Sequence, residues 1–263
     1  MWHPFAKKLV PQVAHHASLL PHCIAILVCW ALPALYTLYD RDRGSAIFAA
    51  VEALTCAVGN GLLTALPLYM ASQDFSSYAT DAAVQALIWV LFMAMYFPLE
   101  GHMNAALTAG AWACGQVSLA IGTVFVSAQC LGTALGVEIA RLAVRPELHQ
   151  HVGYPAPPYV EEAGAFWFAL SFEVGCSVLM VLVQLGLFSS IDKRYVVAST
   201  LVVVLTRYTG AAMDPLGPTS GAIFGRDASP HLLSIYWVGG LVGGAIAGWI
   251  WRHVLGREGA LDE

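Results

Sequence analysis

The sequence predicts an all-α membrane protein, an inverted repeat of six transmembrane helices with two re-entrant half-helices and an extra apolar segment at the amino terminus. The first observation behind this fold class is composition. Of the 263 residues, 58% are hydrophobic and 11% charged, against about 45–50% and about 25% in soluble domains. The second is that the apolar residues form runs able to cross a hydrocarbon core of about 30 Å. The third is a short motif that occurs twice.

The apolar runs provide seven candidate membrane segments. They are residues 19–39, 46–70, 82–99, 117–140, 165–188, 196–206 and 232–251. The first lacks a signal cleavage site and is too long for a cleaved signal, so a retained helix is expected. Because Pro33 would kink it, a short interfacial helix is the alternative. The short sixth run is expected to extend through residues 207–209 and to end at Pro215.

The charges predict an orientation and exclude some functions. Basic residues at 41–43, at 193–194 and at Arg252 are expected to share the cytoplasmic side of the membrane. The chain has a net charge of −5 and no run of like charge, so nucleic-acid binding is not indicated. All six cysteines lie in apolar stretches without a C-x-x-C pair, which predicts neither a zinc site nor a disulfide framework.

The repeated motif centres on Met followed by Asn or Asp. Residues 101–108 read Gly-His-Met-Asn-Ala-Ala-Leu-Thr after the third run, and residues 209–216 read Thr-Gly-Ala-Ala-Met-Asp-Pro-Leu after the sixth. A lone membrane glutamate precedes each motif, Glu52 in the first unit and Glu173 in the second. Since each unit holds three spans, an odd number, the two units are expected to have opposite topology.

Asn104 and Asp214 stand at the centre of the two motifs. Both residue types are good helix N-caps, and the segment after each is short, so each motif is expected to be a half-helix that dips into the membrane. Two half-helices entering from opposite faces would meet with their positive dipole ends near the middle of the bilayer. Such a junction repels cations and protons, whereas a neutral molecule can pass.

These residues resemble the motifs of the aquaporin (major intrinsic protein) family in both order and spacing. Glu52-Ala-Leu-Thr55 resembles its first-helix E-x-x-T, and the two repeated motifs resemble its G-x-H-x-N-P-A-x-T and second N-P-A loops. Residues 128–132 are similar to its A-Q-x-x-G and residues 236–239 to its Y-W-x-G/A. The degenerate boxes, the extra amino-terminal segment and an ending similar to A-x-W-x-x-R look most like the superaquaporin branch, which includes the plant small basic intrinsic proteins.

The resemblance implies a membrane channel for water and small neutral solutes, not an enzyme, and no cofactor. It implies three parts: an extension at 1–45, a channel domain at 46–252 with repeats at 46–140 and 165–252, and a cytoplasmic tail at 253–263. It also implies a homotetramer in the lipid bilayer of the endoplasmic reticulum or another internal membrane, with the plasma membrane as the alternative. The other function left open is a non-conducting protein of the same fold with a structural or interaction role.

Both pore motifs depart from Asn-Pro-Ala. Ala105 is a good helix former although it lacks the fixed φ of proline, so the first half-helix is expected to form. Asp214 can cap a helix but has no N–H to offer a permeating hydroxyl. We expect it to act as a capping acceptor with conduction of neutral solutes; a cap in a closed pore is the alternative. The pore-motif residues are Asn104, Ala105, Ala106, Asp214, Pro215 and Leu216.

By the spacing of the family, the selectivity filter falls on Val84, Val202, Ala211 and Gly217. All four are small and none is polar, and Gly217 stands where the family usually has an arginine. A wider and more apolar constriction than that of a strict water channel is expected, open to glycerol, urea-like solutes or hydrogen peroxide. Arg207 either substitutes as a pore cation or extends to the membrane interface.

Three further residues carry expected roles. By resemblance, His102 lines the cytoplasmic vestibule; the alternative is a packed side chain of the half-helix. Ionisable residues inside membrane runs are functional or structural, and by resemblance Glu52 and Glu173 accept hydrogen bonds from the backbone of the two loops. A metal enzyme using Glu100, His102 and amino-terminal histidines has the wrong spacing for an H-E-x-x-H site, so no metal is expected.

Glycines recur in the last apolar run, at Gly239, Gly240, Gly243, Gly244 and Gly248. Small residues at this spacing let two helices cross closely. They serve either packing within the chain or a dimerisation face.

Overall fold

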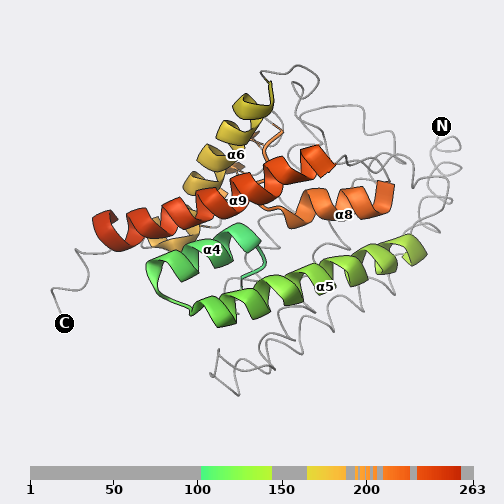
Figure 1. The fold of residues 1–263 in the computed structure, drawn as a ribbon, viewed down its shortest axis with the longest axis horizontal. Helices are drawn as coiled ribbons and strands as arrows, with labels where there is room; N and C mark the ends of the chain where they lie inside the picture. Colours follow the sequence, from blue (N-terminus) through green and yellow to red (C-terminus); the bar gives the residue numbers. More distant parts are fainter. Residues whose placement is uncertain are drawn as a thin grey trace, which may run out of the picture. The chain divides into compact units, whose positions relative to one another are not determined.

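The structure is a computed structural model that describes residues 102–143, 165–187, 193–194, 196–198, 200–201, 204–205, 210–225 and 230–255. Within these ranges the chain is helical and contains no strand. The elements in chain order are α4 (Ala105–Cys114), α5 (Leu119–Ala143), α6 (Ala165–Leu182), the π-helical η3 (Val183–Leu187), α8 (Leu216–Gly225), α9 (Pro230–Ile250) and the π-helical η4 (Trp251–Leu255) (Figure 1).

Three helices in the described part of the chain are long and apolar enough to cross a membrane: Leu119–Glu138, Phe166–Leu187 and Pro230–Leu255. They confirm the fourth, fifth and seventh segments expected from the sequence. The last begins at Pro230, because proline at the first helical position lacks only an N–H that has no helical partner there. The first three expected segments lie outside the described residues, and the sixth is described only in part, where it is helical.

The helices α4 and α8 are short, with ten residues each. At 1.5 Å per residue they are about 15 Å long, half of a hydrocarbon core. Helix α4 ends at Gly115, which has a left-handed φ of 88° and returns its N–H to the last turn. Glycine adopts this conformation without the clash of a Cβ atom. The ribbon in Figure 1 shows both elements as short helices beside the long ones.

Helices α6 and α9 run in the same direction. Near their starts, the rings of Phe166 and His231 stack with centroids 4.4 Å apart. Near their ends, the ring of Trp251 lies close to Gly186: a Cβ atom on Gly186 would lie 3.2 Å from it. The end of η3 and the start of α9 therefore lie at opposite ends of these helices, an arrangement that agrees with a sixth span between them.

Each half-helix contacts the last long helix of both halves of the described chain. Helix α4 packs against α5 and also against α9, and α8 packs against α9 and also against α5. An exchange of this kind is what two repeats related by a twofold axis produce, because the axis swaps α4 with α8 and α5 with α9.

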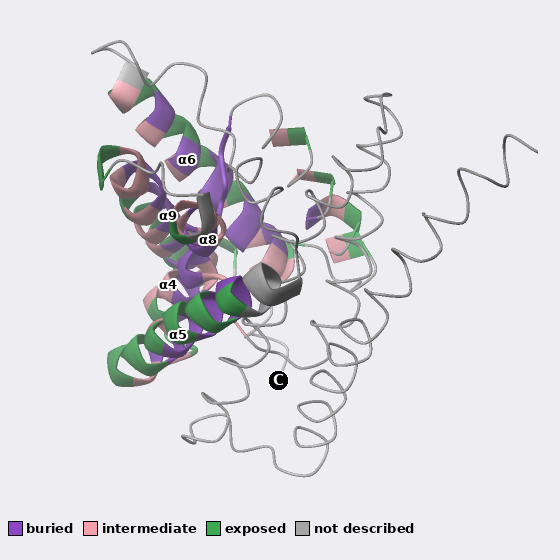
Figure 2. Ribbon diagram, turned by 90° about the vertical axis from the view of Figure 1, so that its right-hand side faces the viewer, coloured by how far each residue is buried: buried purple, intermediate pink, exposed green. Residues whose placement is uncertain are grey.

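Helix α9 lies between α4 and α6, and glycines line both contacts (Figures 1 and 2). A Cβ on Gly239 would lie 2.8 Å from Glu173 Cβ, and one on Gly243 2.7 Å from Ser177 Cβ, both on α6. On the opposite side, a Cβ on Gly244 would meet the backbone of Ala106 in α4. These glycines therefore serve close packing within the chain, the first of the two uses expected from their spacing.

Candidate functional site

The first half-helix begins at Asn104. Its backbone is extended, and its Oδ1 accepts hydrogen bonds from the N–H groups of Ala106 (2.7 Å) and Leu107 (3.2 Å). Two N–H groups of the first turn thus gain a partner that the helix itself cannot supply. Ala105 and Ala106 are fully buried in this turn. The half-helix therefore forms with alanine where the family motif has proline.

The amide nitrogen of Asn104 joins the two motifs. Its Nδ2 donates to the carbonyl oxygen of Met213 at 2.7 Å, a contact between residues 109 positions apart. Met213 has a positive φ of 57°, which is rare for a side chain of this size. The contact shows that the two dipping segments meet directly, so the starts of α4 and α8 lie at one place.

Asp214 stands at the start of the second half-helix. Its Oδ1 accepts from the N–H of Leu216 at 3.2 Å, the first residue of α8. The N–H of Ala105, at the start of α4, also interacts with this carboxylate. One acidic group therefore faces the amino-terminal ends of both half-helices, where the two helix dipoles favour a negative group.

Glu173 of α6 holds the segment that leads into the second half-helix. Its Oε2 accepts from the N–H of Ala212 at 2.8 Å and its Oε1 from the N–H of Met213 at 2.7 Å. The side chain is only 1% exposed, so both oxygens are engaged away from solvent. Each of these two hydrogen bonds gives a backbone N–H of the loop a partner in a place that water does not reach. They explain how Met213 is kept at a positive φ, with its N–H on Glu173 and its C=O on Asn104.

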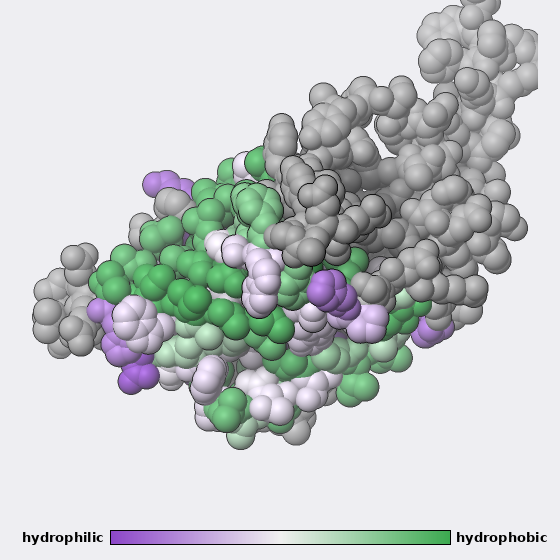
Figure 3. All heavy atoms as spheres, turned by 45° about the horizontal axis from the view of Figure 1, so that its top comes forward, coloured by the Kyte–Doolittle hydropathy of each residue, from purple (hydrophilic) through white to green (hydrophobic). Residues whose placement is uncertain are grey.

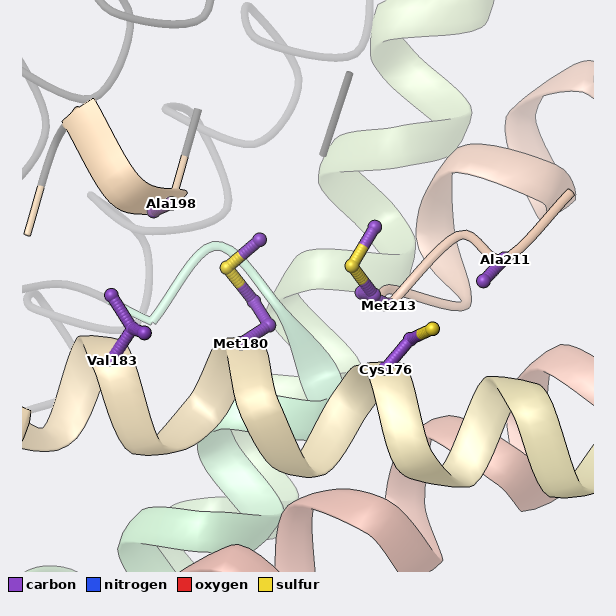
Figure 4. Packing of buried hydrophobic residues seen from close by; sticks show 6 residues of the cluster. All are labelled: Cys176, Met180, Val183, Ala198, Ala211 and Met213. Atoms are coloured by element: carbon purple, nitrogen blue, oxygen red, sulfur yellow. The ribbon is translucent and has the colours of Figure 1, made fainter. Parts of the chain in front are cut away.

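The same segment also packs against α6 through apolar side chains. One buried cluster joins this segment to α6 and η3 (Figure 4). It consists of Cys176 and Met180 of α6, Val183 of η3, and Ala198, Ala211 and Met213. In the close-up, Met213 lies above α6 next to Cys176 and Met180. The carboxylate of Glu173 and this cluster together fix the position of the residues before Asp214.

Residues 45–251 match the major intrinsic protein family. The chain belongs to this family. It is 30% identical over 157 residues to "Probable aquaporin TIP-type" of Medicago truncatula, covering 58% of the chain and 61% of that relative. Over 166 residues it is 27% identical to Aquaporin-4 of Bos taurus, covering 59% and 49%. To Aquaporin TIP1-1 of Arabidopsis thaliana it is 28% identical over 157 residues, covering 58% and 61%.

The chain thus spans about half to three fifths of the length of these relatives. Family membership and the helices described above confirm a multi-pass membrane protein with an aquaporin-like all-α fold. The sequence resemblance to the family was therefore right. The superaquaporin branch stays a prediction.

A buried polar chain braces the first half-helix of this family member. Thr108 Oγ1 donates to the carbonyl of Asn104 at 3.2 Å and accepts from Gln129 Nε2 of α5 at 3.0 Å. Gln129 is fully buried. Gln129 belongs to the family-like motif at residues 128–132, but the sequence predicts no role for it. Its contact with Thr108 arises only when the fold packs α5 against α4.

A matching chain braces the second half-helix. Thr219 Oγ1 donates to the carbonyl of Pro215 at 2.7 Å and accepts from Trp237 Nε1 of α9 at 3.0 Å. The neighbouring Tyr236 donates its hydroxyl to the carbonyl of Gly210 at 3.1 Å. The sequence predicts Tyr236 and Trp237 as part of a family motif but predicts no role for them. In the structure, Tyr236 bonds to the second loop and Trp237 to the half-helix that follows it.

Only two of the four expected filter residues lie in the part of the chain that the structure describes. Ala211 is buried beside the second loop, and Gly217 lies in the first turn of α8. Val84 and Val202 lie outside the described residues, and so does Arg207. The width of the filter is therefore still an expectation from the sequence.

His102 and the glutamate of the first repeat complete the expected set. His102 precedes α4 and lies edge-on to the ring of Phe125 of α5, with centroids 5.3 Å apart. Its vestibule role stays a prediction, and Glu52 lies outside the described residues. In the described part of the chain no group of three His, Cys, Asp or Glu side chains has the arrangement of a metal site.

Proposed function

We propose that this protein is a membrane channel for passive permeation of water, small neutral solutes, or both. The observation that carries the proposal is the 2.7 Å hydrogen bond from Asn104 to Met213, which brings the two half-helix starts to one place. The names of the relatives, all aquaporins, support the same function.

The proposed selection against ions follows from the helix ends. Each amino terminus carries about half a positive charge, so a cation at the junction meets two repulsive ends and loses its water shell. In its ionised form Asp214 would offset part of this barrier, because its side chain lies at the starts of both half-helices. In our proposal it stays occupied as a backbone acceptor, and the passing solutes are neutral.

The proposed solute range rests on the filter. Ala211 and Gly217, with Val84 and Val202, would leave a constriction without a charged or polar side chain. A constriction lined by these four small side chains offers a water molecule no side-chain hydrogen bond and leaves room for larger solutes. Glycerol, urea-like solutes and hydrogen peroxide are therefore proposed beside water. His102 is proposed to line the vestibule and Glu52 to hold the first loop as Glu173 holds the second.

Stopped-flow light scattering of proteoliposomes tests the proposal. Sucrose added outside the vesicles draws water out, and the rate of shrinkage gives the water permeability. With glycerol or urea outside, the rate of re-swelling gives the solute permeability. We expect shrinkage and re-swelling faster than in empty liposomes of the same lipid. Rates equal to those of empty liposomes for every solute would overturn the channel and favour the non-conducting alternative, to which the departures at Ala105, Asp214 and Gly217 point.

We also propose the assembly and location implied by the family resemblance. The chain forms a homotetramer with one pore in each subunit, in the endoplasmic reticulum or another internal membrane. Residues 1–45 form an extension, 46–252 the channel domain and 253–263 a cytoplasmic tail. Light scattering of the detergent complex tests the tetramer, and microscopy of the tagged full chain tests the membrane.

A further inference from the structure

The Lys and Arg side chains that the structure describes, Lys193, Arg194 and Arg252, gather at one end of the helices. This is the end at which α4, η3 and η4 finish. A Cβ on Gly186 in η3 would lie 3.1 Å from Arg194 Nη2 and 3.2 Å from the Trp251 ring, so these two side chains share one spot. Arg194 and the last described turn of the chain therefore lie at the same end of the helices, as the expected orientation requires.

Two glycines let the arginines approach the helix ends. Gly186 has a φ of 123°, which breaks the helix at the end of η3 and leaves no Cβ in the way of Arg194. Gly115 ends α4, and a Cβ there would lie 3.6 Å from Arg252 Nη1. The side chains of Lys193 and Arg252 are both exposed. The side chains of Arg194 and Arg252 thus lie over the ends of η3 and α4.

Exposed apolar side chains border the cations. Trp249 is 56% exposed and lies 5.2 Å from the ring of His253, and Val254 is 58% exposed. The face in Figure 3 is broadly hydrophobic, with hydrophilic side chains in a few patches. Tryptophan next to Lys and Arg at the end of a span is the pattern of a membrane interface, where the chain ends and the lipid headgroups begin.

We propose that this surface, the basic end (Lys193, Arg194, Arg252 and His253), binds the phosphate of an anionic phospholipid headgroup. The guanidinium group of the exposed Arg252 offers paired N–H donors that match phosphate oxygens, and Lys193 and Arg194 add positive charge at the same end of the helices. The lipid tails lie along Trp249 and Val254, which are exposed on the same helix end. Basic surfaces between helix ends at the cytoplasmic side bind such headgroups in other membrane proteins. This site is independent of whether the pore conducts.

The test uses the full chain reconstituted in vesicles of equal parts phosphatidylcholine and phosphatidylglycerol, then extracted in mild detergent. Native mass spectrometry counts the lipid molecules that remain bound. We expect phosphatidylglycerol to be retained in preference to phosphatidylcholine. Each of Arg194→Gln and Arg252→Gln should lower that preference roughly fivefold. Arg141→Gln is the matched control, because Arg141 lies near the far end of α5 from Gly115 and should change nothing.

Two further arms identify the occupant. Inorganic phosphate added before extraction should leave the lipid bound; complete displacement would show a site for free anions instead. Neutralising Glu258, Asp262 and Glu263 in the acidic tail should not alter the preference; a preference that appears only in that variant would show that the tail occupies the basic end.

Equal retention of the two lipids by the unsubstituted protein would overturn the proposal without any variant. So would an unchanged preference in the double Arg→Gln variant. If the Arg→Gln proteins do not fold, Arg252→Lys keeps the charge and should keep most of the lipid. A lower melting temperature of Arg252→Gln with an unchanged lipid preference would mean that Arg252 only stabilises the end of α4 and does not bind lipid.

Discussion

Asn104 and Asp214 occupy matching places at the starts of α4 and α8, yet they secure these helices in different ways. Asn104 accepts from two N–H groups of its own helix and donates to Met213 across the junction. Asp214 accepts from its own helix at Leu216 and from Ala105 of the other, and donates nothing. An N-cap needs only an acceptor, so either residue starts a helix. Only Asn104 can also supply the donor that joins the two loops.

The two half-helices also differ in how they meet α9. Helix α4 lies so close that Gly244 and Gly248 have no room for a side chain, whereas a Cβ on Gly240 would lie 3.2 Å from Pro215 Cδ, just before α8. A threonine in each half-helix accepts a hydrogen bond from a neighbouring long helix, but only the first half-helix has close backbone contact with α9. The loop before the second is held by the side chains of Glu173 and Tyr236. The two half-helices that meet at the junction are therefore held by different kinds of contact. Substitutions in either set of contacts test this difference.

The largest expected effect is at the backbone contact. In Gly244→Ala the new methyl group meets the backbone of Ala106, which cannot move without shifting α4. We expect a loss of about 3 kcal/mol in the free energy of unfolding, and a smaller loss for Gly240→Ala, where Pro215 has more room. Thermal unfolding in detergent measures both.

Gly175→Ala is the control, because nothing lies within 4 Å of a Cβ at that position of α6. It should leave stability unchanged or raise it by up to about 1 kcal/mol. Equal effects of the substitutions at 244, 240 and 175 would contradict the close contact of α4 with α9.

The next effect is at Glu173. Glu173→Gln retains one acceptor oxygen, so the N–H of Ala212 or Met213 loses its partner in a buried place. We expect a loss of about 2 kcal/mol, together with lower permeability as the second loop loosens. Glu138→Gln, the same change on the exposed side of α5, should do neither, and a comparable loss in that control would argue against the role of the two hydrogen bonds.

Exchanging the two caps compares them directly. Asn104→Asp removes the donor to Met213 and leaves a buried carbonyl unpaired, which costs about 1–3 kcal/mol. Asp214→Asn keeps the acceptor for Leu216 and should cost only a few tenths of a kcal/mol, since the two residues cap almost equally well. Equal costs in urea or thermal unfolding would mean that the contact across the junction contributes no stability.

The smallest effects are at the threonine braces. Gln129→Leu and Trp237→Phe each remove one donor to a threonine hydroxyl, and about 1 kcal/mol is expected for each. The hydroxyls of Thr108 and Thr219 keep their bonds to the backbone. A double variant measured against the two singles should be additive, because the braces lie on different half-helices.

Much of the fold was predictable because a membrane leaves few choices. Apolar runs of the right length gave the long helices, and the start of α4 after Asn104 follows from a capping residue and good helix formers. The resemblance gave the family and also the acceptor role expected of Glu173, since its carboxylate does bind the backbone of the second loop.

What the sequence left out are contacts between residues far apart in the chain. Nothing local tells that Gln129 reaches Thr108, that Trp237 reaches Thr219, or that Met213 takes a positive φ. Those facts depend on how closely α5 and α9 approach the half-helices. The glycines of α9 showed only that some close contact exists; the fold decides that the partners are α4 and α6.

We propose that the two half-helix ends meet to form a path for neutral molecules and a barrier to cations, with Asp214 acting as a cap. One set of proteoliposomes, carrying a pH-sensitive dye and studied by light scattering, measures osmotic shrinkage and proton entry together. We expect shrinkage faster than that of empty liposomes, proton entry at the level of empty liposomes, and the same pattern in Asp214→Asn. Fast proton or cation entry that disappears in Asp214→Asn would contradict it.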